Sequence, residues 1–435
     1  MRKRLIGSAI AFGLMTAAAG HAQLLPGIGA LPGRITGGLL TGEAGTPVVG
    51  GVVDTLGIDR IGAGLPPTSL LDLRRERLRA LIRANRSVLE ADDDGNPVRR
   101  GEIVAIDPAP ALLAAASAAG FSIIRQDRID ALDMAMAILA APHGDSAREA
   151  IARLRKIAPD GRFEFNHVFE PAGGALAAGT MLLAASSGSA PSGAIGMIDG
   201  GVSAHPALAR ATIEQRGFVT GAPHGSGHGT AIASLLVGED GAFRGAAAGR
   251  SLLAADVYGG QPAAGSADAI ARAIGWMAGR GVPVITISLV GPPDGLIERA
   301  VSAAHARGIV IVAAVGNDGP AAPALYPASY PGVIAVTGVD ARGRALIEAG
   351  RAAHLDFAAP GADMAAALPG RGYATVRGTS FAAPLVAARF AAQAGDPAAR
   401  LTAVAGEARA GHGRIGRGIL CASCRIDPSA VRAKK

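Results

Sequence analysis

From residue 193 onward, short runs of apolar residues alternate with segments of helical periodicity. The runs carry few charges, so each is predicted to be a strand that is buried on both of its faces. Such strands form parallel sheets, which predicts an α/β fold with helices covering both faces of a mostly parallel sheet. The predicted strands are 193–198, 251–257, 282–290, 309–315 and 333–337. The predicted helices are 230–237, 266–278, 294–307 and 380–392.

The stretch 101–170 has a different, more compact pattern. Its order is strand, helix, strand, strand, helix, strand, which suits a small ferredoxin-like α/β domain. These elements are predicted at 102–106, 108–119, 121–124, 134–140, 146–157 and 163–169. A further helix is predicted at 69–90, with an apolar face and six arginines. We interpret it as a solvated helix packed on a neighbour, and a membrane-surface helix is the alternative.

Three segments separate these regions. Residues 23–67 and 171–192 are rich in small residues and predict linkers, and the second is an accessible place for proteolytic processing. The acidic segment 92–97 is predicted to be a turn that ends the first helix. It lacks the alternating ligands and the distal Glu of a calcium loop, so structural calcium is not indicated, and no cofactor is expected.

The first residues carry a targeting signal. A basic start, Arg2-Lys3-Arg4, precedes an apolar stretch at 5–19 and a small-x-small site at 20–22. This pattern predicts a cleaved signal peptide over 1–22, and a short uncleaved anchor is the alternative. No later stretch is long and apolar enough to be a convincing transmembrane anchor. The chain is therefore expected to be exported, to the periplasm or the extracellular medium.

Composition narrows the picture further. Of the 435 residues, 49% are hydrophobic but only 3% are aromatic, so the core must rely on Ala, Leu, Ile and Val. The formal net charge is +7, and removing the three basic residues of 1–22 leaves +4, from 39 basic and 35 acidic residues. No basic stretch is interleaved with aromatic residues, so nucleic-acid binding is not indicated.

The only two cysteines, Cys421 and Cys424, lie in a C-terminal tail at 421–435. In an exported chain, this C-x-x-C spacing favours a small structural disulfide loop. Free thiols and a metal or redox site are the alternatives. Zinc would need two further ligands, and only His412 is near in sequence.

Four short motifs supply the side chains needed for acyl transfer. Ser380 lies in Gly378-Thr-Ser-Phe-Ala-Ala-Pro384 at a predicted helix start, where backbone N–H groups favour negative charge. His228 lies in a glycine-lined segment and can take the proton of a serine. Asp199 leaves a buried strand and can orient an imidazole, whereas Asn317 follows another strand and can donate to an oxyanion. Taken singly, these residues are also common as a helix cap, a loop histidine and turn residues.

The order Asp, His, Asn, Ser, with the strings around them, resembles the subtilisin-like serine proteases, the subtilase family. The resemblance covers about residues 193–420, and the His-Gly-Thr string favours His228 over the nearby His224 as the base. It implies a peptidase domain in which Asp199, His228 and Ser380 form a catalytic triad of the kind established for that family. Asn317 would then be the oxyanion donor.

The resemblance also implies how a peptide is bound. Two strand segments would flank the primary pocket and pair with the backbone of the peptide. The matching residues are Ser288, Leu289, Val290 and Gly291 on one side, and Ala313, Ala314, Val315 and Gly316 on the other. Residues 68–170 are similar in position and pattern to the propeptide that assists folding of many subtilases and blocks their site. The expected partners are protein or peptide substrates and the chain's own propeptide.

Two departures from the family pattern keep a second hypothesis open. Gly200 stands where the family usually has a hydroxyl residue, which we expect to loosen packing, and Val290 stands where it commonly has Gly. The first hypothesis is a secreted or periplasmic serine endopeptidase made as a precursor. The second is an exported, catalytically impaired binding or assembly module, and an esterase using the same residues is a third. An α/β-hydrolase is not indicated, because it needs Gly-x-Ser-x-Gly and a different residue order.

Overall fold

The computed structural model describes residues 67–172, 193–370 and 372–431. The predicted signal peptide and most of both predicted linkers lie outside the described residues. The described residues belong to one compact unit, Val48–Lys435. Among them, no helix combines the length and the apolar character that crossing a membrane requires.

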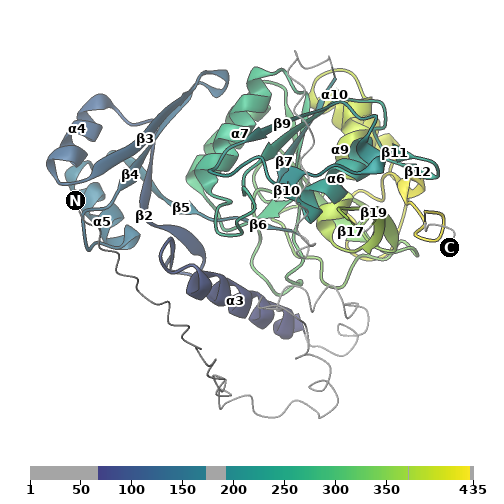
Figure 1. Ribbon diagram of the computed structural model, residues 1–435, viewed down its shortest axis with the longest axis horizontal. Coiled ribbons are helices and arrows are strands. Elements are labelled where there is room, and N and C mark those ends of the chain that lie inside the picture. The colour runs from purple at the N-terminus through teal and green to yellow at the C-terminus, as the bar shows by residue number, and fades with distance from the viewer. Residues whose placement is uncertain (1–66, 173–192, 371, 432–435) are drawn as a thin grey trace, which may run out of the picture. The chain divides into compact units, whose positions relative to one another are not determined.

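The larger part is built on a seven-stranded sheet with the order β18-β17-β16-β14-β7-β13-β9 (Figure 1). Every neighbouring pair in it is parallel. The strands are β7 (Ile195–Asp199), β9 (Ile213–Gly217), β13 (Leu252–Asp256), β14 (Val284–Ile287), β16 (Val310–Ala314), β17 (Val333–Val339) and β18 (Phe357–Pro360). The predicted α/β fold with a mostly parallel sheet is therefore confirmed.

Helices cover both faces of this sheet (Figure 1). On one face lie α7 (Ala267–Gly279) and α8 (Gly295–Ala306). On the other lie α6 (Gly227–Val237) and α9 (Thr379–Ala392), with α10 (Pro397–Gly406) packed on α9. Successive residues of each strand belong to hydrophobic clusters on opposite faces of the sheet. Ile195 and Met197 therefore pack toward α6 and α9, whereas Ile198 packs toward α7.

The smaller part has the predicted ferredoxin-like order. Its sheet runs β1-β2-β4-β3, with β5 paired to β2, and every pairing is antiparallel. The elements are β1 (Leu89–Ala91), β2 (Pro97–Ile106), α4 (Pro110–Ala118), β3 (Ser122–Ile129), β4 (Met134–Ala140), α5 (Ala147–Ile157) and β5 (Arg162–His167). The helix α5 begins at a capping box made by Ser146 and Glu149.

The predicted helix 69–90 is too long at its C-terminal end. The helix α3 (Pro67–Ala84) stops before Asn85, whose side chain donates to the carbonyl oxygen of Leu81 at 2.9 Å. The chain then turns into β1, which pairs with β2. The predicted acidic turn is present, since the Asp92 carboxylate accepts the backbone N–H groups of Asp94 and Asn96. It joins β1 to β2, however, and does not end the helix as predicted.

Other elements differ from the sequence prediction. The predicted strand 282–290 is split into β14 and β15 (Leu289–Val290), because β15 leaves the main sheet to pair with β6 (Glu170–Pro171). The sequence prediction missed β9, β18 and α10, and also a hairpin of β19 (Met364–Leu368) and β20 (Gly372–Val376). Cys421 and Cys424 form the predicted disulfide.

Candidate active site

The four candidate residues lie at the ends of elements on one edge of the main sheet. Asp199 is the last residue of β7, and Asn317 follows the end of β16. His228 and Ser380 lie in the first turns of α6 and α9. Parallel strands end at a common edge, which is where ligands bind in such sheets. Asp199, His228 and Ser380 are all buried, with exposed fractions of 1%, 4% and 0%.

Asp199 and His228 form a hydrogen-bonded pair. The ring Nδ1 of His228 lies 2.8 Å from Oδ2 and 3.0 Å from Oδ1 of Asp199. The backbone N–H of Gly200 also donates to Oδ1 of Asp199, at 2.7 Å. With Nδ1 donating to the carboxylate, Nε2 is the ring nitrogen that can accept a proton. His224, the competing candidate for the base, is positioned by a different carboxylate, because its backbone N–H donates to Asp256 at 2.7 Å.

Ser380 Oγ and His228 Nε2 are buried, and neither has a hydrogen-bond partner among the described residues. Buried polar atoms without a partner are rare in folded proteins because desolvation without a hydrogen bond is costly. Catalytic hydrogen bonds in free enzymes are often long and tighten only when substrate binds. The Ser380 hydroxyl and Nε2 of His228 therefore both keep free hydrogen-bonding capacity at this site. The Phe381 ring packs beside His228, with ring centroids 5.5 Å apart.

The segment that carries Ser380 is fastened to two neighbouring segments. Gly378 supplies a φ of 140°, which opens the sharp turn into α9. Ser288 Oγ donates to the carbonyl oxygen of Ser380 at 3.0 Å. The hydroxyl oxygen of Thr379 accepts the backbone N–H of Gly316 at 3.2 Å. These contacts fix the serine against both segments that the sequence analysis assigned to peptide binding.

Asn317 is oriented by the same turn. Its Oδ1 accepts the backbone N–H of Thr379 at 3.0 Å, which leaves Nδ2 as its donor group. The backbone N–H of Ser380 lies in the first turn of α9, where amide groups have no partner within the helix. An amide side chain and a helix-terminal N–H are the donors that can stabilise a tetrahedral oxyanion.

The expectation that Gly200 loosens packing is wrong. A Cβ atom at this position would lie 2.5 Å from Oγ of Ser226. That hydroxyl accepts the N–H of Gly229 at 2.9 Å, capping the helix α6 that carries His228, and donates to the carbonyl oxygen of Gly201 at 3.2 Å. Gly200 therefore makes room for the cap that fixes the histidine's helix.

The two predicted peptide-binding segments lie together, and the chain's own residues 168–172 occupy the groove beside one of them. β6 pairs antiparallel with β15, so that Pro171 faces Leu289 and Glu170 faces Val290. Beyond this pair, the N–H of Ala172 donates to the carbonyl oxygen of Ser288 at 2.8 Å.

A second wall of this groove was missed by the sequence analysis. The N–H of Phe169 donates to the carbonyl oxygen of Gly265 at 2.8 Å, and Tyr258 donates its hydroxyl hydrogen to the Phe169 carbonyl oxygen at 2.8 Å. Residue 168 forms an antiparallel bridge to Ser266. The fully buried Phe169 ring lies against Gly291, where a Cβ atom would come within 2.6 Å of it. Residues 168 and 169 thus contact one segment of the main domain, and residues 170–172 contact another.

The end of the segment 168–172 that contacts Ser288 belongs to an apolar cluster. Ala172 is buried in one cluster with Val290, Ala314 and Leu325. The Val290 side chain points toward Gly316, since its Cγ1 lies 3.5 Å from the place of a Cβ there. Val315 and Ala313 are buried toward the opposite face of the sheet. Val290 therefore fills part of the space between the two predicted peptide-binding segments.

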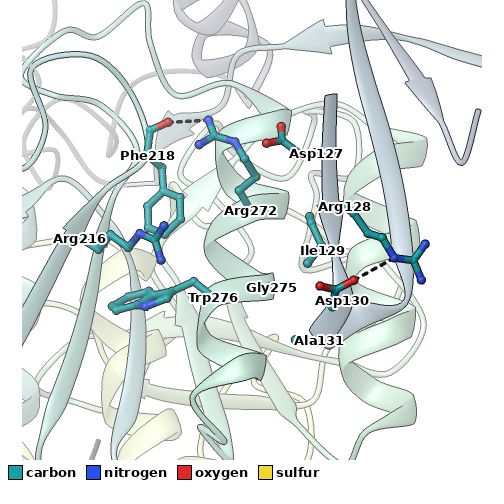
Figure 2. A pocket seen from close by; sticks show the side chains of 10 residues that line it. All are labelled: Asp127, Arg128, Ile129, Asp130, Ala131, Arg216, Phe218, Arg272, Gly275 and Trp276. Carbon is teal, nitrogen blue, oxygen red and sulfur yellow. Dashed lines mark hydrogen bonds and ion pairs between the residues drawn. The ribbon is translucent and has the colours of Figure 1, made fainter. Parts of the chain in front are cut away.

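A separate cavity of about 240 Å³ lies where the turn after β3 approaches β9 and α7 (Figure 2). None of Asp199, His228, Asn317 or Ser380 lines it. The Arg216 guanidinium lies over the Phe218 ring at 5.3 Å and over the Trp276 ring at 6.0 Å, and Figure 2 shows these side chains on one side of the cavity. These cation–π contacts give Arg216, Phe218 and Trp276 a packing role.

Known proteins match the same region. Residues 192–403 match the subtilase family model. Subtilisin Savinase of Lederbergia lenta is 36% identical over 202 residues, covering 44% of this chain and 72% of that protein. The alkaline protease of Alkalihalobacillus alcalophilus is 36% identical over 202 residues, covering 44% of this chain and 51% of that protein.

A solved structure extends the likeness in fold. Fervidolysin from Fervidobacterium pennivorans, a keratinolytic enzyme related to subtilisin, matches with a TM-score of 0.63 at 18% identity. The match covers 80% of this chain and 62% of fervidolysin. The motifs, the buried Asp–His pair beside a helix-terminal serine, and the match to most of a subtilisin agree with one another. This chain belongs to the subtilase family of serine proteases.

Proposed function

We propose that this chain is the precursor of an exported serine endopeptidase that cleaves peptide bonds through an acyl-enzyme. The observation that carries this proposal is the hydrogen-bonded Asp199–His228 pair together with the buried, unpartnered hydroxyl of Ser380. Export is proposed from the signal-peptide pattern at 1–22, which lies outside the described residues.

The proposed reaction uses groups of this chain only. Ser380 Oγ attacks the scissile carbonyl carbon while its proton passes to Nε2 of His228. Asp199 holds the Nδ1–H and stabilises the imidazolium that forms. Asn317 Nδ2 and the Ser380 N–H stabilise the tetrahedral oxyanion. His228 then gives its proton to the leaving amine, and a water molecule repeats the sequence to release the acid and restore Ser380.

The alternative of an impaired binding module has lost one of its two arguments. Gly200 was one departure from the family pattern, and the position has a packing reason beside Ser226. Val290 was the other departure from the family pattern. Its position is compatible with a narrow primary pocket in an active enzyme as well as with an impaired active site. An endopeptidase with a small primary pocket is the function that these contacts support best.

We also propose that the predicted propeptide, residues 68–170, extends to Ala172 and inhibits the site in the precursor. Residues 168 and 169 contact the segment 265–266, and residues 170–172 pair with the segment 288–290, where a substrate would pair. Ala172 is next to the nucleophile, because Ser288 accepts its N–H and donates its own hydroxyl to the Ser380 carbonyl. The bond that follows Ala172 is therefore the proposed processing site.

A buried histidine supports the same assignment, because it joins the proposed propeptide to the peptidase domain. His167 Nδ1 lies 2.8 Å from Asp294 at the start of α8, and its Nε2 lies 3.3 Å from Asp92. Burial alone would lower the pKa of His167, but the two carboxylates outweigh it and raise this pKa from 6.5 to about 9. Because the pKa is raised, this contact is fully present below about pH 6.5 and is lost as the pH rises through about 9.

The processing site gives the direct test of the proposed function. We expect the wild-type precursor to be cut between Ala172 and Gly173, and Ser380→Ala to remain uncut. N-terminal sequencing and intact mass of the purified proteins measure this. A mature chain that starts after Gly193, or the same cut in Ser380→Ala, would contradict the proposal.

The Val290 side chain predicts a preference for a small residue before the cut. We expect peptides with Ala at that position to be cleaved with a higher kcat/KM than peptides with Phe. In Val290→Gly, the lost apolar bulk should raise kcat/KM for the Phe peptide by about tenfold. The Ala peptide, measured on the same variant, is the control for an intact triad. An unchanged ratio between the two peptides would mean that Val290 does not limit the pocket.

A further inference from the structure

The helix α3 precedes the ferredoxin-like part, yet its side chains reach the loop that follows the oxyanion donor. Nε of Arg74 lies 3.0 Å from Oδ2 of Asp318, and Nη2 of Arg77 lies 3.0 Å from Oδ1 of the same residue. Asp318 directly follows Asn317 and is only 6% exposed. The Leu70 side chain lies against Gly319, where a Cβ atom would come within 2.9 Å of it.

Arg77 contacts a second carboxylate, on the strand that fills the groove. Its Nε and Nη2 donate to the two carboxylate oxygens of Glu170 at 3.2 and 3.3 Å. Burial would lower the pKa of Arg77, but Glu170 and Asp318 outweigh it and raise this pKa, so the guanidinium stays charged. One cation therefore joins the groove strand β6 to the loop beside Asn317.

These contacts involve only one face of α3. Leu78 is buried on that face, and Leu81 packs on a small cluster of Leu89, Val168 and Ala263. On the solvent side, Arg75 pairs with Asp72 and Arg83 pairs with Glu76, all within the helix. The side chains of Arg75 and Arg83 are more than half exposed. The helix thus presents two of its arginines to the active-site region and keeps others in water.

We infer that Asp318, Gly319 and Glu170 form a docking surface for α3, and that α3 is a second inhibitory element of the precursor. This inference rests on the proposed function. Cutting the bond after Ala172 removes the covalent link between β6 and the peptidase domain. β6 itself is a two-residue strand, so its backbone pairing is short. The attachment through Arg77 adds to the contacts of the ferredoxin-like part, such as His167 to Asp294, and holds β6 itself at the groove. More contacts must therefore open before a substrate can enter.

In this arrangement, α3 controls how long the cut precursor takes to reach full activity. Arg74, Arg77 and Glu170 all precede the proposed cut, so variants at these positions release a mature enzyme of wild-type sequence. Any change in the onset of activity then reports on the inhibitor and not on the catalytic residues. A purely structural role of α3 would alter the yield of cut precursor and leave the onset after cutting unchanged.

The test compares the full-length wild type with Arg74→Met/Arg77→Met, and with Arg75→Met/Arg83→Met as the matched control. Cutting is followed on a gel, and activity is followed with a peptide substrate. We expect all three to be cut at Ala172–Gly173. The lag between cutting and full activity should shorten by about tenfold or more in Arg74→Met/Arg77→Met and stay unchanged in the control. Raising salt from about 0.1 M to about 1 M should shorten the wild-type lag by a larger factor than that of the variant, because the variant keeps only the other ion pairs of this interface, such as Arg299 to Asp107.

Equal lags in the wild type and in Arg74→Met/Arg77→Met would overturn the inference. Absence of any cut in the wild type would instead overturn the proposed function, so the two failures are distinguishable. If the double variant does not mature, Glu170→Gln carries the same prediction, because it removes one partner of Arg77 and leaves α3 unchanged. A wild-type lag in Glu170→Gln would overturn the inference as well.

Discussion

Ser380→Ala is expected to lower kcat for peptide hydrolysis by about a millionfold, the magnitude established for the nucleophile of subtilisin. Without the hydroxyl, the scissile carbonyl has no nucleophile from the protein, and His228 has no proton to accept. The fold should remain, because the Ser380 hydroxyl has no hydrogen-bond partner among the described residues. The measurement is steady-state hydrolysis of a peptide, together with thermal unfolding of the same preparation.

A matched control variant distinguishes the loss of the nucleophile from the loss of any other serine hydroxyl. Ser302 is exposed on α8, so Ser302→Ala removes a hydroxyl that has no part in the proposed site. We expect it to keep wild-type kcat. Turnover by Ser380→Ala at the wild-type rate would refute the assignment of the nucleophile.

Asp199→Asn is expected to lower kcat by about ten thousandfold, as for the equivalent change in other serine proteases with this triad. The carboxylate lies within 3.0 Å of Nδ1 of His228 through both oxygens and fixes the proton on that nitrogen. An amide in its place can donate to Nδ1, which moves the ring proton to Nε2 and leaves no base for Ser380. It also removes the charge that stabilises the imidazolium.

The control for this change is Asp363→Asn. Asp363 is an exposed carboxylate that accepts the N–H of Ala341, and its φ of 52° is one that asparagine adopts readily. We expect its kcat to equal that of the wild type. A loss below tenfold in Asp199→Asn would mean that the Asp199–His228 hydrogen bond does not set the tautomer during catalysis.

The main sheet and the candidate triad could be predicted because the signals that specify them are local. A strand buried on both faces reads as an unbroken apolar run, and the runs at β7, β13 and β16 are of this kind. Strand β9 was missed because its sequence, Ile-Glu-Gln-Arg-Gly, is mostly polar and lies at the edge of the sheet. The family strings then assigned roles to residues that would each be ordinary alone.

The filling of the groove could not be predicted, because it depends on contacts between distant segments. Pro171 pairs with Leu289, and Arg77 contacts Asp318 from 241 positions away. No periodicity along the chain records which strand a short segment such as β6 will join. The structural reason for Gly200 could not be predicted either. Ser226 lies against Gly200 because β8 (Gly201–Val202) pairs with β10 (Gly225–Ser226), which is again a contact between distant segments.

The most direct measurement of the central claim is covalent labelling by a fluorophosphonate probe, which reacts with activated serines. Wild type and Ser380→Ala would be treated in parallel while precursor size is followed on a gel. We expect labelling and processing of the wild type alone, with the probe attached to Ser380. A wild-type protein that is folded and fully processed yet unlabelled would contradict the account and favour a binding module.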